Sequence, residues 1–300
     1  MKAVLSGKEM KEFDARSIKG YGIPSLVLME RAAMAVAEKA EEILEKEEAG
    51  TVWSVCGFGN NGADGVAAAR MLFLKGYDVK IVFPQRDGKG SEELEAQLNV
   101  VKRLGIPVMT AEELPDAEEK RSPAHPFAKT ETKANACRGV ILDAVFGIGL
   151  SRNVEGAYRK LIRWINGQED MKVIAVDIPS GISSDNGSVM GDAVRADVTV
   201  TFGMKKLGQV LFPGREYCGE LLVRDVGFVP ESSADAGSGE SDGSGYVTPV
   251  QNVPESSASE ESTESSSAKS SSESSAAENS GNTESGQEQA GSSESTQSSA

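Results

Sequence analysis

The chain has 300 residues, a net charge of −15 and a single histidine. Histidine-based acid–base chemistry and a multi-histidine zinc site are therefore excluded. No apolar run reaches the roughly 18 residues of a membrane helix, and no charged start precedes an apolar stretch, so the sequence predicts neither a membrane nor a secreted protein.

The acidity is concentrated at the end of the chain. Residues 231–300 hold 24 Ser, 13 Asp or Glu, one Lys and one aromatic residue, a net charge of −12 that leaves about −3 for residues 1–230. Such a segment cannot bury enough apolar surface to offset the entropy of ordering, so we predict a disordered Ser/Glu-rich acidic tail. Residues 1–230 suit one α/β domain. No basic patch indicates nucleic acid as a partner, and the tail would repel it.

The cysteines and the histidine carry little functional signal. Cys56, Cys137 and Cys218 are widely spaced and form no C-x-x-C motif. An odd number of such cysteines fits a reduced compartment, so we expect free thiols and a cytoplasmic location. His125 lies in a polar, proline-flanked stretch and is expected at the solvated surface.

The first half of the chain alternates helical and strand patterns. Apolar residues at helical spacing predict helices over 6–19 and 25–46, separated by the sequence GYGIP. The run TVWSVC at 51–56 reads as a short buried strand, followed by a glycine loop and the helix GVAAARMLFLKG. DVKIVF at 78–83 is the next strand, which Pro84 ends.

The second half continues the alternation up to a final strand. A helix over 91–103 and an edge strand over 107–110 precede a polar segment at 111–138. Apolar strands alternating with helices predict a mainly parallel sheet covered on both faces, a Rossmann-like three-layer fold with additional N-terminal helices. The remaining elements are a strand ending near Asp143, a helix over 156–167, and strands over 172–179, 196–203 and 220–228.

The loop after the first long strand has the spacing of a dinucleotide-binding motif. Gly57-Phe58-Gly59-Asn60-Asn61-Gly62 fits G-x-G-x-x-G, and its backbone N–H groups at a helix start suit phosphate. A plain strand–helix turn that needs glycine is the alternative interpretation. The acidic residue that would bind an adenosine ribose is missing after the strand 78–83, which runs into Pro84-Gln85-Arg86. This absence argues against an ordinary nicotinamide-dependent oxidoreductase.

Polar residues follow three strands that should end at one edge of the sheet, where ligands of such folds gather. Their side chains offer only oxygen-rich groups, which suit potassium, sodium or magnesium rather than zinc. Asp143 and Asp177 also fit as plain helix caps or turn formers. The residues are Asn60, Asn61, Asp64, Asp143, Asp177 and Ser180.

Five ordered motifs resemble the NAD(P)HX epimerase family over residues 3–229. They are PSLVLMERAA, GNNGAD, DAVFGIGLSRNVEG, VDIPSGISSDNG and TFGMKKLGQVLFPGREYCGELLVRDVGF. The resemblance implies that residues 1–230 form an NAD(P)HX epimerase-like domain that interconverts the R and S forms of NADHX and NADPHX at C6 of the nicotinamide ring. It also implies a separate S-specific dehydratase as functional partner and a homodimer.

The resemblance further implies which residues form the site. Asn61, Asp143 and Ser180 would coordinate a potassium ion. Ala63 stands where the family usually has glycine, and Ile148 where a hydroxyl residue is common. The substrate-binding residues implied are Asn60, Asn61, Gly62, Ala63, Asp64, Gly147, Ile148, Gly149, Leu150, Ser151, Arg152, Asn153 and Asp177.

The chemistry implied is loss of water from C6 to a planar iminium and readdition from the other face. Carboxylates can supply the acid that assists departure and the base that aims water. We expect Asp177 to be the acid–base residue, with Asp64 second. A non-catalytic nucleotide-binding or scaffold module on the same fold is the alternative.

Overall fold

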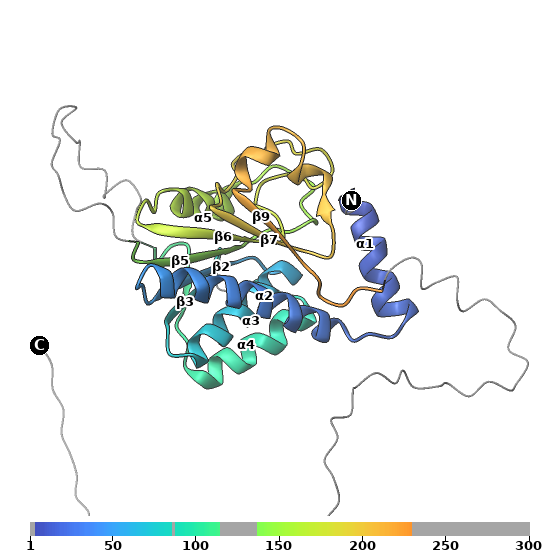
Figure 1. Cartoon of the computed structure of the whole chain (residues 1–300). Coiled ribbons are helices and arrows are strands. Elements are labelled where there is room, and N and C mark those ends of the chain that lie inside the picture. The colour runs from blue at the N-terminus through green and yellow to red at the C-terminus, as the bar shows by residue number, and fades with distance from the viewer. Residues whose placement is uncertain (1–3, 86–87, 115–136, 230–300) are drawn as a thin grey trace, which may run out of the picture. The chain divides into compact units, whose positions relative to one another are not determined.

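The computed structural model describes residues 4–85, 88–114 and 137–229 (Figure 1). Its centre is a seven-stranded sheet in the order β4-β3-β2-β5-β6-β7-β9, in which every pair of neighbours is parallel. The α/β fold with a parallel central sheet is therefore confirmed. The strands are β2 Thr51–Cys56, β3 Asp78–Phe83, β4 Val108–Thr110, β5 Gly139–Ala144, β6 Met171–Val176, β7 Val198–Phe202 and β9 Glu220–Arg224.

Helices cover both faces of this sheet, as Figure 1 shows. Along β5, Val140 and Leu142 belong to the core formed with α2 and α3, whereas Ile141 belongs to the core formed with α5. Successive side chains of a strand point to opposite faces, so a strand buried on both sides is largely apolar along its whole length. The helices are α1 Gly7–Ala15, α2 Ser25–Lys46, α3 Asn60–Leu74, α4 Glu92–Leu104 and α5 Gly156–Asn166.

Local signals fix the ends of several helices. Ser6 caps α1 in a capping box: its Oγ accepts from the N–H of Glu9, whose carboxylate accepts from the N–H of Ser6 at 2.7 Å. The chain continues from α1 as one π-helical turn, Arg16–Gly20. Ser91 caps α4, and Gly105 ends it in the left-handed conformation that favours glycine.

The sequence did not predict a second, two-stranded sheet. It pairs β1 Val4–Leu5 in parallel with β8 Lys205–Lys206, which follows β7 directly. Two short 3-10 helices, η2 Leu207–Gln209 and η3 Gly214–Tyr217, complete the connection to β9. The pairing ties the start of the chain to the carboxyl end of β7 and so brings α1 to that edge of the main sheet.

The observed boundaries differ from the expected ones at the edge where the strands end. Helix α3 begins at Asn60, so residues 60–64 form its first turn instead of a loop. Gly62 makes this possible, because a Cβ there would lie 1.9 Å from the carbonyl oxygen of Gly57. The expected strand over 172–179 ends earlier in the structure, at Val176 of β6. It ends there because Asp177 adopts a positive φ of 68°.

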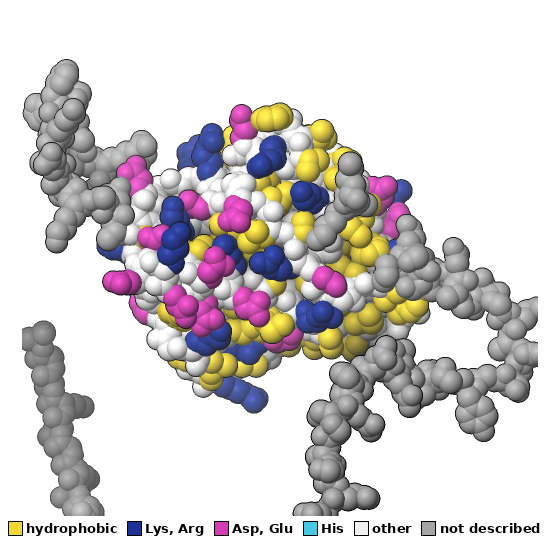
Figure 2. Space-filling model, in the orientation of Figure 1, with side chains coloured by type: hydrophobic (Ala, Val, Ile, Leu, Met, Phe, Trp, Pro, Cys, Tyr) yellow, Lys and Arg dark blue, Asp and Glu magenta, His cyan; other side chains and the backbone are white. Residues whose placement is uncertain are grey.

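The surface of the described residues carries mixed charge. Figure 2 shows basic and acidic side chains interspersed on the face in view, without the continuous basic surface that nucleic acid requires. No helix among the described residues is long and apolar enough to cross a membrane. All three cysteines are free thiols. The predicted acidic tail, His125 and Arg86 lie outside the described residues.

Candidate active site

A cavity of about 520 Å³ lies at the carboxyl edge of the sheet, where the fold class places its ligands. The loops after β2, β5 and β6 contribute to its wall, as the sequence predicted. The N-terminal helices add residues that the sequence did not single out, among them Met10, Asp14 and Ser25. Of the residues expected at the site, those that line the cavity are Asn60, Asn61, Asp64, Gly147, Ile148, Gly149, Leu150 and Asp177.

The other expected residues lie around the cavity and do not line it. Gly62 and Ala63 are buried in the first turn of α3, and Ala63 has no positive φ, so its methyl group is accommodated without backbone strain. Asp143 and Ser180 are fully buried beneath the cavity wall. The remaining ones, Ser151, Arg152 and Asn153, are exposed.

The start of α3 opens onto the cavity with its backbone uncapped. Gly59 is the N-cap residue in an extended conformation, and no side chain within the described ranges hydrogen-bonds to this helix end. Gly59, Asn60 and Asn61 all line the cavity. The N–H groups of this turn and the positive end of the helix dipole make it suited to a phosphate group.

Aromatic side chains form two further parts of the wall. Phe58 lines the cavity and stacks on Phe83 with ring centroids 5.2 Å apart. Phe146 and Tyr158 both line it and contact each other with centroids 4.8 Å apart. Flat apolar surfaces of this kind suit a planar ring.

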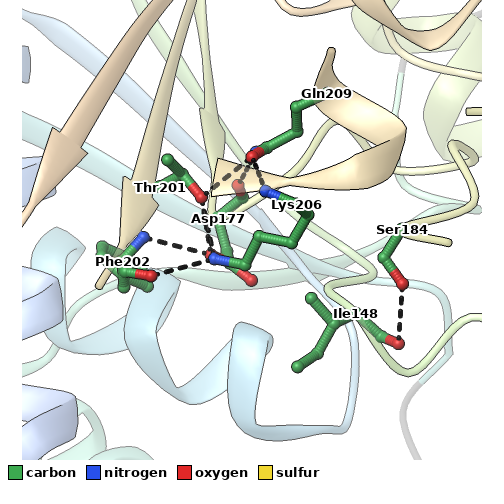
Figure 3. Close-up of polar contacts among 7 residues, drawn as sticks. All are labelled: Ile148, Asp177, Ser184, Thr201, Phe202, Lys206 and Gln209. Atoms are coloured by element: carbon green, nitrogen blue, oxygen red, sulfur yellow. Dashed lines mark hydrogen bonds and ion pairs between the residues drawn. The ribbon is translucent and has the colours of Figure 1, made fainter. Parts of the chain in front are cut away.

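Asp177 is held by an extensive set of hydrogen bonds (Figure 3). It is 8% exposed, and its Oδ1 accepts from the Oγ1 of Thr201 at 3.2 Å and from the N–H of Phe202 at 3.3 Å. Its carbonyl oxygen accepts from Nε2 of Gln209 at 2.6 Å, which fixes the left-handed backbone at this position. Residues held in this region persist only where the surroundings over-determine them, and they cluster at functional sites.

Lys206 is the partner that the sequence reasoning missed. Its side chain is 1% exposed, forms an ion pair with Oδ1 of Asp177 and lines the same cavity (Figure 3). Its Nζ also donates to Oγ1 of Thr201 at 2.8 Å and to the carbonyl of Phe202 at 3.0 Å. Its position shortly after an apolar strand, at the edge of the sheet where ligands bind, is the feature of the sequence that could have indicated a role at the site.

Asp64 differs from Asp177 in its surroundings. Burial raises the pKa of Asp64 well above its ordinary value, and the nearby carboxylates of Asp177, Asp14 and Glu93 raise it further, against the opposing charge of Lys206. Burial and the charges of Asp177 and Glu93 also raise the pKa of Asp14. Among the carboxyl groups that line the cavity, Asp177 therefore has a close counter-charge, whereas the pKa values of Asp64 and Asp14 are raised.

The three residues expected to bind a cation lie around the end of β5. Oδ2 of Asp143 accepts from the N–H of Ser180 at 2.8 Å, and Oγ of Ser180 lies 3.3 Å from the carbonyl oxygen of Phe146. Burial raises the pKa of Asp143 to about 6, against the hydrogen bonds that its carboxylate accepts from Ser180 and from the N–H of Val145. The amide of Asn61 packs against Gly147, and its Nδ2 is buried without a hydrogen-bond partner among the described residues. The donor set is all oxygen, which fits a hard cation.

A parallel sheet covered by helices, with a small-molecule cavity over its carboxyl edge, places the protein among the Rossmann-like α/β proteins that bind a ligand there. Residues 25–208 match the family described as YjeF-related protein N-terminus. The chain belongs to this family, that of the NAD(P)H-hydrate epimerases.

Individual relatives agree with this assignment. The chain is 38% identical to the NAD(P)H-hydrate epimerase of Oenococcus oeni, with 74% of this chain and 96% of the relative aligned. It is 40% identical to the bifunctional NAD(P)H-hydrate repair enzyme Nnr of Thermofilum pendens over 73% of this chain, but spans only 39% of that relative's length. The crystal structure of yeast ynu0 has the same fold, with a TM-score of 0.60 and 21% identity over 79% of this chain and 94% of the yeast chain.

Proposed function

We propose that the protein is an NAD(P)H-hydrate epimerase that interconverts the R and S epimers of NADHX and NADPHX. The observation that carries this assignment is the pairing of Asp177 and Asp64 on one cavity in a chain of the epimerase family. A scaffold module has no need to bury an ion pair such as Lys206–Asp177 in the wall of an open cavity, since a well-packed apolar pair of similar volume would be at least as stable.

The cavity offers separate places for the two chemical parts of the substrate. The phosphates bind at the uncapped start of α3, next to Asn60 and Asn61, and the loop from Gly147 to Asn153 contacts the nucleotide from the other side. The hydrated nicotinamide ring lies near Asp64 and Asp177.

The two carboxyl groups then share the acid–base work. Asp64, whose pKa is raised well above its ordinary value by burial, gives its proton to the C6 hydroxyl as that group leaves as water, while the lone pair of the ring nitrogen forms the iminium. Asp177 accepts a proton from the water that adds to the opposite face of C6. The product is the other epimer, and transfer of the proton back to Asp64 through solvent restores the starting state.

A potassium ion would be bound through the side-chain oxygens of Asn61, Asp143 and Ser180, which lie around the end of β5 and suit a hard cation. When bound, it supplies positive charge close to the loop that receives the nucleotide. Exchange of potassium for tetramethylammonium at constant ionic strength should weaken substrate binding. Unchanged binding would remove the ion from the proposal and leave the epimerase assignment intact.

The product requires a second enzyme. Because epimerisation alone repairs nothing, we infer that an S-specific NAD(P)H-hydrate dehydratase consumes the S form, as the fused architecture of the bifunctional relative suggests. We also infer a homodimer, which light scattering of the purified chain would measure.

The decisive assay uses a mixture of hydrated NADH epimers with an excess of S-specific dehydratase. The dehydratase alone removes the S form and leaves the R form to decay at its spontaneous rate. Adding this protein should make the R form disappear as well, with the absorbance of the regenerated NADH as the readout. Consumption of the R form at only the spontaneous rate would refute the proposed function and favour the scaffold alternative.

A further inference from the structure

Lys206 carries a fully buried charge that is held among the groups surrounding Asp177. Its ammonium has three protons, and three acceptors take them: Oδ1 of Asp177, Oγ1 of Thr201 and the carbonyl of Phe202. No proton remains for a substrate. Lys206 therefore cannot act as a proton donor without breaking this set, although it lines the cavity.

The same contacts make the two oxygens of Asp177 unequal. Oδ1 accepts hydrogen bonds from Nζ of Lys206, from Oγ1 of Thr201 and from the N–H of Phe202. Oδ2 accepts no hydrogen bond within the described part of the chain, while the residue as a whole lines the cavity. One oxygen is thus anchored, and the other is left to take a proton.

We propose that Lys206 is a positioning residue for epimerisation: it anchors Oδ1 of Asp177 and supplies the counter-charge that keeps Oδ2 available as the base. A buried carboxylate without such a partner would tend to hold a proton of its own. Gln209 completes the arrangement, since its Oε1 accepts from the N–H of Lys206 at 2.8 Å and its Nε2 donates to the carbonyl of Asp177. This inference rests on the proposed function.

The test is a double-mutant cycle on the full chain, with kcat and KM measured in the coupled dehydratase assay. Lys206→Met keeps the length of the side chain and removes the charge, and we expect kcat to fall about 100-fold with little change in KM. In the Asp177→Asn background the same substitution should change kcat by less than about twofold. Lys205→Met is the matched control, because Lys205 precedes Lys206 on β8 and does not line the cavity, so it should leave kcat unchanged.

A second pair of variants covers the case in which Lys206→Met does not fold. Thr201 and Thr199 are both fully buried on β7, but Oγ1 of Thr201 contacts Asp177 and Lys206, whereas Oγ1 of Thr199 donates to the carbonyl of Cys218. Thr201→Val should lower kcat about tenfold, and Thr199→Val should lower thermal stability alone.

The outcomes separate this inference from the proposed function. A wild-type chain that fails to interconvert the epimers refutes the function. If the wild-type chain is active but Lys206→Met and Lys205→Met have the same kcat, only the role of Lys206 is refuted. The same holds if the double variant loses kcat by the product of the losses in Lys206→Met and Asp177→Asn. Equal kcat in Thr201→Val and Thr199→Val would do the same.

Discussion

The ion pair between Lys206 and Asp177 should leave a strong signature in stability as well as in catalysis. The two side chains are 1% and 11% exposed, so neither charge is fully solvated when its partner is removed. Breaking a buried pair from one side typically costs about 3–5 kcal/mol, because the remaining charge stays buried. Lys206→Met removes the closest donor to Oδ1 and leaves only the weaker ones from Thr201 and Phe202.

Asp177→Asn changes the other partner of the pair: it removes the negative charge and keeps the size of the side chain. Asparagine tolerates the positive φ of 68° at this position about as well as aspartate, so backbone strain should be unchanged. The lysine keeps its bonds to Thr201 and Phe202, and we expect a loss of about 3 kcal/mol. The double variant buries no unpaired charge, so its loss should be smaller than the sum of the two by at least about 2 kcal/mol.

Urea unfolding followed by circular dichroism measures these free energies. With a slope of about 3 kcal/mol per molar urea, a loss of about 4 kcal/mol lowers the midpoint by roughly 1.3 M, well within the range of the method. The slope itself should not change. Free energies that add to within about 0.5 kcal/mol would mean that the two charges do not interact, and the ion pair would then have no part in stability.

Three further predictions concern other parts of the structure. Asp64→Asn should lower kcat about 10²–10⁴-fold. Burial raises the folded pKa of Asp64 above its unfolded value, so the stability that this group contributes is full below about pH 4 and is lost as the pH rises through the folded pKa. In urea melts the stability of Asp64→Asn relative to wild type should therefore increase as the pH rises above about 4, and a constant difference would contradict this. Gly65→Ala should destabilise by about 1–3 kcal/mol, because its Cβ would lie 2.3 Å from Cβ of Ala144, whereas Gly50→Ala meets nothing within 4 Å and serves as the control in thermal unfolding. Arg70→Met removes the hydrogen bonds that Nη2 of Arg70 on α3 donates to both carboxylate oxygens of Glu30 on α2 at 2.7 Å. It should lower the free energy of unfolding by about 1 kcal/mol in the same measurement and leave kcat unchanged. A lower kcat would show that these helices also shape the site.

Much of the fold could be predicted because local patterns and tertiary packing agree. The run TVWSVC became β2 and DVKIVF became β3 with the expected bounds, since continuous apolar segments of this length are best buried as central parallel strands. The long helix 25–46 was likewise found with its expected ends. Its apolar stripe faces the sheet, and periodicity alone reports such a stripe.

The short elements escaped prediction for the opposite reason. Strands β1 and β8 have two residues each, and each pairs with the other from the opposite end of the domain, in the register Val4 to Lys205. Nothing local specifies such a pairing. The start of α3 at Asn60 also depends on contact, because Gly62 must fit against the carbonyl of Gly57 before the helix can begin there.

The sequence by itself determined the order along the chain of the long helices and of the strands of the main sheet, the family resemblance and the polar residues at the strand ends, since each depends on a continuous stretch of chain. Tertiary structure alone decided which of these residues meet and in what electrostatic state. Lys206 looked like an ordinary charged residue until folding buried it against Asp177, and Asp64 acquired its raised pKa from burial and from carboxylates on other elements. The pKa and the interaction energy of a charged side chain depend on neighbours that are distant in sequence, because desolvation and Coulomb interactions depend on distances in the folded chain. Hydrophobic periodicity, in contrast, can be read from a continuous stretch of sequence.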